Sequence, residues 1–355
     1  MNYYERVKNI PLKKEPIILK KEPIILGIES SCDETAASIV KGGRKILSNV
    51  IISSATEQAK YGGVVPEIAS RAHTEAVSKS VKRAVLEAGL KFSDIDAVAV
   101  TYGAGLLGAL LVGVSYAKSL AYALNVPLIA VSHVRGHMAA CYLADENLQP
   151  PFIGLLTSGG HTAVTVVKSY TEMQILGSTL DDAVGEAFDK VARVLGLPYP
   201  GGPNVERLAK EGKNDIVLPK MLKNSDGYDF SYSGLKTAVI NYVHNKEQKG
   251  ETVNKADLAA SFQSAAIDVL CDKAIKAAKE YNIDTIAIGG GVAANGYFRE
   301  QIEKKCRDRS INAVLPPKVL CTDNACMIAA EGYIKYTNRE FADLTLNAQA
   351  SVELR

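Results

Sequence analysis

Two histidines four positions apart are the residues with the clearest chemical potential. They stand in the segment SHVRGH as His133 and His137, after a strand-like apolar run and at the start of a helix predicted over 134–143. Residues at i and i+4 share one face of a helix, so both imidazoles could bind one metal ion. The peptidase pattern H-E-x-x-H needs a glutamate after the first histidine as general base, and Val134 occupies that position. We therefore predict a metal pair rather than a peptidase centre, with two unconnected histidines as the alternative.

Three carboxylates could contribute to the same chemistry. Asp323 stands where a closing helix is predicted, over 323–336, and could be either a third metal ligand or the N-cap of that helix. Asp33 and Glu34 follow the first predicted strand. They could act as a general acid and base in catalysis, contact a metal through water, or stabilise a turn.

Three turns rich in glycine or hydroxyl residues follow predicted strands, at 30–35, 157–162 and 289–295. Such turns expose backbone N–H groups that can bind phosphate oxygens, although each could also be a simple tight connection. GGGVAA at 289–294 matches the dinucleotide pattern G-x-G-x-x-[GA], but the next strand ends without the acidic residue that binds ribose. The sequence also contains no GxxxxGK[ST] motif. We therefore predict a nucleotide-like ligand whose phosphate is bound by backbone amides, hydroxyls and metal.

Strand-like and helical patterns alternate along almost the whole chain. Strands are predicted over 24–28, 36–40, 46–53, 95–101, 128–131, 152–156, 162–167, near Ile175, 285–288 and 313–315. Helices are predicted over 66–89, 106–124, 134–143, 183–195, 235–244, 255–281, from Tyr297, and over 323–336. This alternation is typical of α/β architecture with a mostly buried sheet in each half.

Two similar segments indicate that the halves are related. GIESSCDET at 27–35 and GLLTSGGHT at 154–162 match at Gly, Ser and Thr positions, and each joins a first strand to a second. The strand–helix pattern restarts after Gln149-Pro150-Pro151, which is typical of a linker. We predict a duplicated lobe.

The composition is that of a soluble globular protein of two domains. The 355 residues are 47% hydrophobic and 23% charged, and the net charge of +2 excludes a global basic field for nucleic acid but not a local patch. Six cysteines without a CxxC pair are typical of reduced thiols. The apolar stretch 103–117 ends at Lys118, short of the ~20 residues of a membrane span, and the N-terminus lacks a signal-peptide core. We expect a cytoplasmic protein that does not associate with membranes.

Six motifs occur in the order seen in the TsaD family, the tRNA N6-adenosine threonylcarbamoyltransferases: GIESSCDET, SHVRGHMAA, LLTSGGHT, AFDKVAR, PGGP and IAIGGGVAANG. The chain resembles this family from about Ile24 to about Tyr336. The resemblance implies the actin/Hsp70/sugar-kinase (ASKHA) fold, an α/β fold of two ribonuclease-H-like lobes that face a central nucleotide cleft. Lobe I is expected over 24–147, completed by a C-terminal helix over 325–350, and lobe II over 148–324. Residues 1–23, with the octapeptide LKKEPIIL repeated in tandem from Leu12, are expected to be an N-terminal extension.

The resemblance also implies roles for individual residues. The family's metal pair matches His133 and His137, and its third metal ligand matches Asp323, with Fe²⁺ favoured over Zn²⁺. Its substrate-binding positions match a loop and several later residues: Leu156, Thr157, Ser158, Gly159, Gly160, Asp189, Gly202, Glu206 and Asn295. Two positions depart from the family pattern. Archaeal and eukaryotic relatives have a metal-ligating tyrosine where Leu156 stands, and bacterial relatives often have aspartate where Glu206 stands.

The implied reaction transfers the threonylcarbamoyl group of threonylcarbamoyl-AMP to N6 of the adenosine 3′ to the anticodon, in tRNAs that read codons beginning with A. An adenylate or ATP-type ligand would occupy the cleft. The implied partners are tRNA, a TsaB-type paralogue and a TsaE-type small ATPase. The alternatives are a small-molecule kinase and a nucleotide-gated binding protein of the same fold. A small-molecule kinase would have no use for the paired histidines, and a nucleotide-gated binding protein would still function without them.

Overall fold

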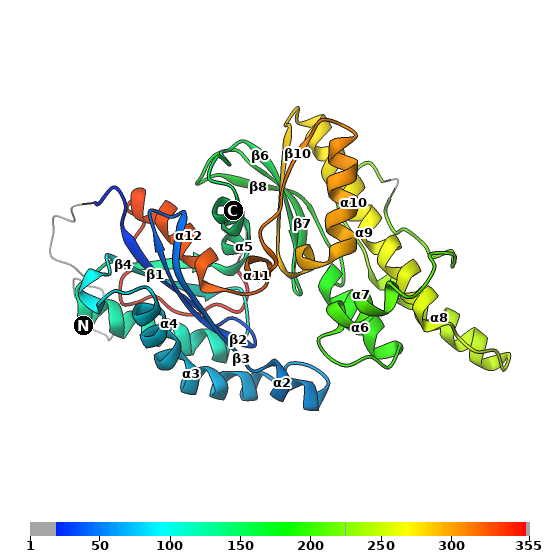
Figure 1. The fold of residues 1–355 in the computed structure, drawn as a ribbon, viewed down its shortest axis with the longest axis horizontal. Helices are drawn as coiled ribbons and strands as arrows, with labels where there is room; N and C mark the ends of the chain where they lie inside the picture. The colour runs from blue at the N-terminus through cyan, green and yellow to red at the C-terminus, as the bar shows by residue number, and fades with distance from the viewer. Residues whose placement is uncertain (1–18, 224, 353–355) are drawn as a thin grey trace. The chain divides into compact units, whose positions relative to one another are not determined.

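The computed structural model describes residues 19–223 and 225–352 (Figure 1). The first LKKEPIIL copy, apart from its last residue, and most of the expected extension over 1–23 lie outside the described residues. The chain forms two compact units. Of the described residues, unit 1 contains those from 19 to Leu148 together with Asp323 to residue 352, and unit 2 those from Gln149 to Thr322.

Unit 1 is built on a five-stranded mixed sheet in the order β3-β2-β1-β4-β5. Its strands are β1 (Ile24–Glu29), β2 (Glu34–Lys41), β3 (Lys45–Ser53), β4 (Ala97–Gly103) and β5 (Leu128–Ser132). β2 is antiparallel to both of its neighbours, whereas β1, β4 and β5 run parallel. β1 lies at the centre and is buried on both faces, which explains its nearly continuous apolar sequence.

Helices cover both faces of this sheet (Figure 1). They are α2 (Ala55–Gln58), α3 (Pro66–Glu87), α4 (Leu107–Leu124), α5 (His133–Ala144) and α12 (Ala325–Thr337), with short 3₁₀ turns η1 (Ala59–Tyr61) and η2 (Phe92–Asp94). On one face, Leu26 and Ile28 of β1 join a core with residues of α3 and α4. Gly27 faces the opposite side, where it lies against α12.

Unit 2 is built on a second five-stranded mixed sheet in the order β10-β9-β6-β7-β8. Its strands are β6 (Phe152–Thr157), β7 (Thr162–Val167), β8 (Met173–Ser178), β9 (Thr285–Gly289) and β10 (Asn312–Val314). Its helices are α6 (Val184–Val194), α7 (Gly201–Ala209), α8 (Ser233–Gln248), α9 (Lys255–Glu280), α10 (Gly296–Arg307) and α11 (Lys318–Cys321), with the 3₁₀ turn η3 (Gly291–Ala294). Strand β6 is central, with β9 and β7 on its two sides, and the apolar core between sheet and helices includes Phe188 of α6 and Phe262 of α9.

The two sheets have the same topology. Counted within each unit, the strand order from one edge to the other is third, second, first, fourth and fifth. GIESSCDET and GLLTSGGHT each span the turn between the first and second strands of their own sheet. The predicted α/β fold with a duplicated architecture is therefore confirmed.

One helix of unit 1 is long and apolar enough to cross a membrane by length and composition alone. This helix is α4, with 18 residues and a mean hydropathy of 1.4. It continues beyond Lys118, where the sequence analysis places the end of the apolar stretch, and the Nζ of Lys118 donates to the carbonyl of Leu346. Ala109, Leu110 and Val114 of α4 are buried in the core of unit 1, so its apolar character is used in packing there.

Two local predictions differ from the structure. The closing helix runs from Ala325 to Thr337, so it begins after Asp323 and ends well before residue 350, because the chain beyond Thr337 leaves the helical conformation. Its N-cap is Asn324, whose Oδ1 accepts from the N–H of Met327. The N-cap alternative for Asp323 is therefore wrong, because the next residue fills that position. The segment that starts at Gly201 is a helix, α7, which the sequence analysis did not predict.

Candidate metal centre and ligand-binding loops

His133 and His137 lie on the first turns of α5, directly after β5. Both side chains are buried, and the two rings meet edge to face with their centroids 4.5 Å apart. The predicted arrangement on one helical face is thus present, because the i, i+4 spacing brings the rings together.

Asp323 reaches both histidines from the segment just before α12. Its Oδ1 lies 3.5 Å from Nε2 of His133 and 3.4 Å from Nε2 of His137. One ligand atom from each of the three residues falls within 4.8 Å of the others. The structure therefore brings together the three residues that the sequence analysis assigned to a metal.

Glu29 orients His133 from the other side of the ring, a role that the sequence analysis missed. Glu29 is fully buried at the end of β1, and its Oε2 accepts from Nδ1 of His133 at 3.0 Å and from Oγ1 of Thr101 at 2.6 Å. Its Oε1 accepts from the N–H of Ser31 at 2.5 Å. Because a carboxylate only accepts, Nδ1 carries the proton and Nε2 faces Asp323. The sequence feature that could have revealed this role is the charge of Glu29 at the end of the otherwise apolar strand β1.

Burial and charge act in opposite directions on these groups. Burial lowers the pKa of His133, but the nearby Asp323 and Glu29 carboxylates outweigh it and raise that pKa to about 9. Burial and the neighbouring His133 hold the pKa of His137 below its ordinary value. The pKa of Asp323 is lowered to about 2 because the attraction of both histidines exceeds the cost of burial. The centre is thus a cation–carboxylate array in which His137 favours the neutral form that binds metals.

The residues present fit a divalent metal ion. Among the described residues, neither buried ring nitrogen of His137 has a hydrogen-bond partner of ordinary length, although Nε2 lies 3.4 Å from Oδ1 of Asp323. A buried imidazole with no partner is costly unless it has another ligand. Two imidazoles and one carboxylate are donors that suit Fe²⁺ or Zn²⁺. Leu156, which stands where some relatives have a ligating tyrosine, is buried in β6 of unit 2 and offers no ligand atom.

Asp33 and Glu34 lie at the end of the turn between β1 and β2. Their side chains share a hydrogen bond, and Oε1 of Glu34 also accepts from Oγ of Ser53. Burial, the bond to Asp33 and repulsion from Asp323 raise the pKa of Glu34 to about 9. Glu34 is therefore protonated near neutral pH.

His73 of α3, for which the sequence analysis named no partner, supports the same turn. Its Nδ1 lies 2.7 Å from Oγ1 of Thr35, and its Nε2 lies 2.9 Å from the carbonyl of Cys32. A carbonyl only accepts, so Nε2 carries the proton and Nδ1 accepts from the threonine. His73 is thus a structural residue that links α3 to the β1–β2 turn.

The SGG turn of unit 2 joins β6 to β7 and is exposed at its tip. The N–H of Ser158 donates to the carbonyl of His161 at 2.8 Å, so this amide is used within the turn. Gly159 and Gly160 are exposed, and a Cβ at either position would meet nothing within 4 Å. Thr157 is buried, and its Oγ1 donates to the carbonyl of Gly289 at the end of β9. The tip therefore offers backbone atoms to a ligand without side chains in the way.

Gly290 packs directly against this turn. Its φ of +99° lies in a region that L side chains rarely adopt, and a Cβ there would lie 2.6 Å from the carbonyl carbon and oxygen of Thr157. Only glycine lets the β9–η3 connection approach the base of the SGG turn so closely. The two glycine-rich turns predicted in this half are thus neighbours at the carboxyl ends of β6 and β9.

Three further predicted substrate contacts have partners within unit 2. Oδ1 of Asp189 accepts from the N–H of Gly201 at 2.7 Å, at the start of α7. Oε1 of Glu206 accepts from the N–H of Gly296 at 3.1 Å. Asn295 caps α10 through Oδ1, and its Nδ2 donates to Oε1 of Gln263 at 2.8 Å. These residues therefore hold α7 and α10 in place.

Gly202 differs from Asp189, Glu206 and Asn295 because it has open space beside it. Within the part of the chain that the structure describes, a Cβ placed on Gly202 would meet nothing within 4 Å. It stands beside Gly201 at the start of α7 and is half-buried. The N-terminal turn of α7 is thus open to a ligand at this point.

Replacing Asp189 with alanine is expected to lower the free energy of unfolding by about 1 kcal/mol, because the first amide of α7 loses its acceptor. Asp189→Asn keeps an acceptor oxygen and is expected to cost a smaller amount. Chemical denaturation of both variants measures the difference. Equal losses in the two variants would show that the charge, and not the hydrogen bond to Gly201, stabilises this position.

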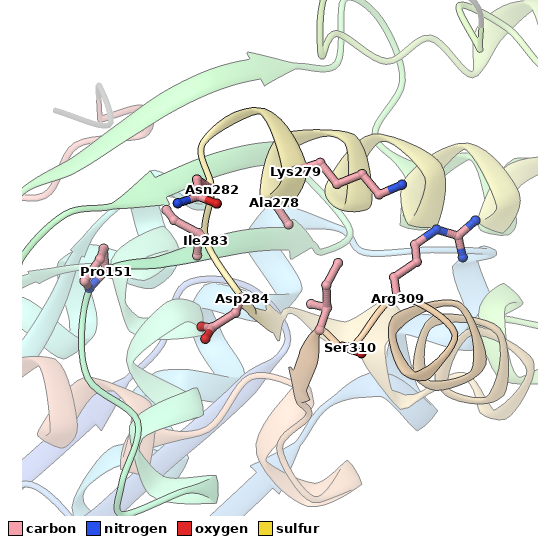
Figure 2. Close-up of a pocket in the computed structure, with 9 residues that line it drawn as sticks. Pro151, Ala278, Lys279, Asn282, Ile283, Asp284, Arg309 and Ser310 are labelled. Carbon is pink, nitrogen blue, oxygen red and sulfur yellow. The ribbon is translucent and has the colours of Figure 1, made fainter.

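Two surface recesses lie elsewhere and contain none of the predicted site residues. One, of about 580 Å³ in unit 2, lies before the starts of β9 and β10 and includes Lys279, Asp284 and Arg309 (Figure 2). The other, of about 750 Å³ in unit 1, lies between β3, η1 and α3. The first recess is at the amino ends of β9 and β10, whereas the glycine turns follow the carboxyl ends of β6 and β9.

Comparison with known proteins associates the chain with one enzyme family. The sequence matches the family described as "TsaD: tRNA N6-adenosine threonylcarbamoyltransferase" over residues 45–330. It is 50% identical over 330 residues to a protein of that name from Clostridium botulinum (strain Kyoto / Type A2), covering 93% of this chain and 97% of the relative. It is 53% identical over 331 residues to the Clostridium novyi (strain NT) protein of the same name, with 93% and 97% covered.

Solved structures with low sequence identity have the same fold. HypF from T. kodakarensis has a TM-score of 0.62 at 17% identity, over 93% of this chain and 50% of that chain. Component A of (R)-2-hydroxyglutaryl-CoA dehydratase from Acidaminococcus fermentans has a TM-score of 0.53 at 16% identity, over 89% of this chain and 99% of that chain. The fold is therefore of the ASKHA type.

Proposed function

Since the chain belongs to the TsaD family of tRNA N6-adenosine threonylcarbamoyltransferases, we propose that it transfers a threonylcarbamoyl group to N6 of an adenosine in tRNA. The donor is threonylcarbamoyl-AMP, and the acceptor is the adenosine 3′ to the anticodon in tRNAs that read codons beginning with A. A bond forms between N6 and the carbamoyl carbon, the bond from that carbon to the phosphate oxygen breaks, and AMP leaves. Family membership is the observation that carries this proposal.

The exocyclic amine of adenine is a weak nucleophile because its lone pair is delocalised into the ring. The protein must therefore position the reactants and stabilise the charge of the leaving phosphate. The amides of Gly159 and Gly160 can donate to phosphate oxygens, because both glycines are exposed and carry no side chain, although Gly185 of α6 packs against one side of Gly159. Ser158 contributes through the shape of the turn, since its N–H is used by His161.

His133, His137 and Asp323 are the residues that would hold one divalent metal, with Fe²⁺ favoured over Zn²⁺. When bound by these residues, such an ion would supply positive charge that could stabilise a leaving phosphate. Glu29 keeps the proton of His133 on Nδ1 and so leaves Nε2 as the ligand atom. The lowered pKa of His137 favours the neutral ring that a metal requires.

The nucleotide part of the donor is assigned to the start of α7 and to Glu206, both in unit 2. Gly202 has no side chain, so the AMP sugar or base can approach the backbone at the open start of α7. Glu206 can contact a ribose hydroxyl with the carboxylate oxygen that does not accept from Gly296. Asp189 and Asn295 act mainly by holding α7 and α10, because their polar atoms already bind the protein.

Proton transfer from N6 is assigned to the carboxylate pair of Asp33 and Glu34. The raised pKa of Glu34 keeps this side chain protonated near neutral pH, and the hydrogen bond that it shares with Asp33 joins the two carboxyl groups proposed to receive the N6 proton. Repulsion from Asp323 contributes to the raised pKa of Glu34, which supports a role close to the candidate metal ligands.

The partners proposed for this chain are a TsaB-type paralogue and a TsaE-type small ATPase, in addition to the tRNA substrate, and its proposed location is the cytoplasm. A small-molecule kinase and a nucleotide-gated binding protein are not favoured. Both would share the fold, but neither accounts for the match to the family along residues 45–330.

Depletion of the protein from its cells is expected to remove threonylcarbamoyladenosine from total tRNA, as measured by mass spectrometry of the nucleosides. Re-expression of the full chain is expected to restore it. A purified reaction with synthetic threonylcarbamoyl-AMP and an unmodified tRNA transcript then identifies the step. Unchanged threonylcarbamoyladenosine after depletion would reject the proposed transferase function.

A further inference from the structure

The three candidate metal ligands come from two parts of unit 1 that are far apart in the sequence. His133 and His137 lie on α5, and Asp323 lies two residues before the start of α12. The distances between the imidazoles and the carboxylate therefore depend on how α5 is placed against α12. These two helices pack against each other.

A buried ion pair joins α5 to α12. The Nε of Arg135 donates to Oε1 of Glu331 at 2.6 Å, and the two side chains are 16% and 3% exposed. Arg135 stands between the two histidines in the sequence, and Glu331 lies within α12. Removal of both charges from water costs free energy that an apolar pair would not require. Stability alone thus does not explain a charged pair at this position.

The two helices come into close contact beside this pair. A Cβ placed on Gly136 would lie 2.8 Å from Cδ1 of Ile328 and 3.4 Å from Cγ of Met327, both on α12. Apolar contacts of this kind favour association but have no direction, so they tolerate small sliding of one helix on the other. A charge-assisted hydrogen bond has a narrow range of length and angle. The bond between Arg135 and Glu331 therefore defines the register of α5 along α12.

We propose that Arg135 and Glu331 are positioning residues for the metal centre, holding α5 in the register on α12 at which His133, His137 and Asp323 can bind one ion. The inference rests on the metal site of the proposed function. Bonds from nitrogen or oxygen ligands to Zn²⁺ are about 2.0–2.2 Å long, and these bond lengths vary by only about 0.2 Å between sites. A slide of α5 smaller than an atomic radius would therefore separate the ligands.

Titration of the full-length chain with Co²⁺ tests the proposal, because the visible absorption of the bound ion reports both occupancy and coordination geometry. Two variants are compared with the wild type: Glu331→Gln, which removes one charge, and Arg135→Met/Glu331→Leu, which replaces the ion pair with an apolar contact. The matched control is Arg83→Met/Glu87→Leu on α3. It removes an exposed Arg–Glu pair of unit 1 that has the same 2.6 Å distance between Nε and Oε1.

Glu331→Gln is expected to weaken Co²⁺ binding about 10–100-fold, the usual effect of losing a residue that orients metal ligands. The paired apolar variant is expected to bind Co²⁺ as weakly, with an altered absorption spectrum, while its thermal unfolding midpoint stays at the wild-type value. The control is expected to bind Co²⁺ like the wild type. Glu331→Gln could unfold the chain because it leaves Arg135 unpaired. Arg135→Met/Glu331→Leu then still tests the positioning role, since it leaves neither charge unpaired.

The outcomes separate this inference from the function on which it rests. Wild-type affinity and spectrum in the paired variant would show that Arg135 and Glu331 serve packing alone, and would overturn the positioning role. A wild-type chain that binds no Co²⁺ would remove the metal site itself and reject both proposals. A weakened control would attribute the effect to general destabilisation and also reject the positioning role.

Discussion

His137→Ala is expected to abolish metal binding and to lower the rate of threonylcarbamoyl transfer about 1,000-fold, since a metal that stabilises a leaving phosphate contributes several kcal/mol. His137 is the most deeply buried of the three candidate ligands, and its Nε2 lies 3.4 Å from Oδ1 of Asp323. Alanine therefore removes a candidate ligand together with its attraction to Asp323. Metal content of the purified chain and the rate with synthetic threonylcarbamoyl-AMP measure the two effects.

The matched control for this variant is His244→Ala. His244 is exposed on α8 of unit 2 and belongs to no part of the proposed site. It is expected to leave metal content and rate unchanged. Full transfer activity of His137→Ala without bound metal would contradict the role proposed for the histidines, whatever the result for the control.

Gly290→Ala is expected to lower the free energy of unfolding by about 2–4 kcal/mol, because a side chain at a φ of +99° is strained and its Cβ would overlap Thr157. The chain can relieve this overlap only by moving the base of the SGG turn. A displacement of about 1 Å in a positioning element can lower catalytic efficiency about 100-fold. Denaturation measures the first effect, and kcat/KM for threonylcarbamoyl-AMP measures the second.

Gly291→Ala provides a control one residue away. A Cβ at this position would meet nothing within 4 Å, and alanine suits the 3₁₀ turn that Gly291 begins. Stability and kcat/KM of this variant are expected to stay close to the wild type. Equal losses in both variants would mean that the turn needs flexibility rather than the close approach of Gly290 to Thr157.

Local patterns of sequence were sufficient to predict most of the fold. Alternation of strand and helix patterns predicted two sheets with covering helices, because burial on both faces requires continuous apolar strands. The similarity of GIESSCDET to GLLTSGGHT predicted duplication, since both segments connect the first two strands of a sheet. The start of α7 was missed because glycine and proline at its first positions also suit a turn.

Hydrogen bonds between distant residues could not be predicted in the same way. Glu29 is 104 positions from His133, and Glu331 is 196 positions from Arg135. Neither separation follows a helical or strand period, so only packing of the elements reveals these contacts. Asp323 could be an N-cap or a ligand on sequence grounds, and the choice required knowing that Asn324 caps α12.

The amino-acid sequence by itself determined the α/β class, the repeated architecture, the spaced histidines and the exposed glycine turns, because each is a property of near neighbours along the chain. Only the tertiary structure decided which carboxylates serve those histidines. Asp323 faces both rings, Glu29 holds the back of one, and Asp33 pairs with Glu34. The physical reason is that side chains converge through the packing of β1, α5 and α12, and the energies of that packing are spread over many residues.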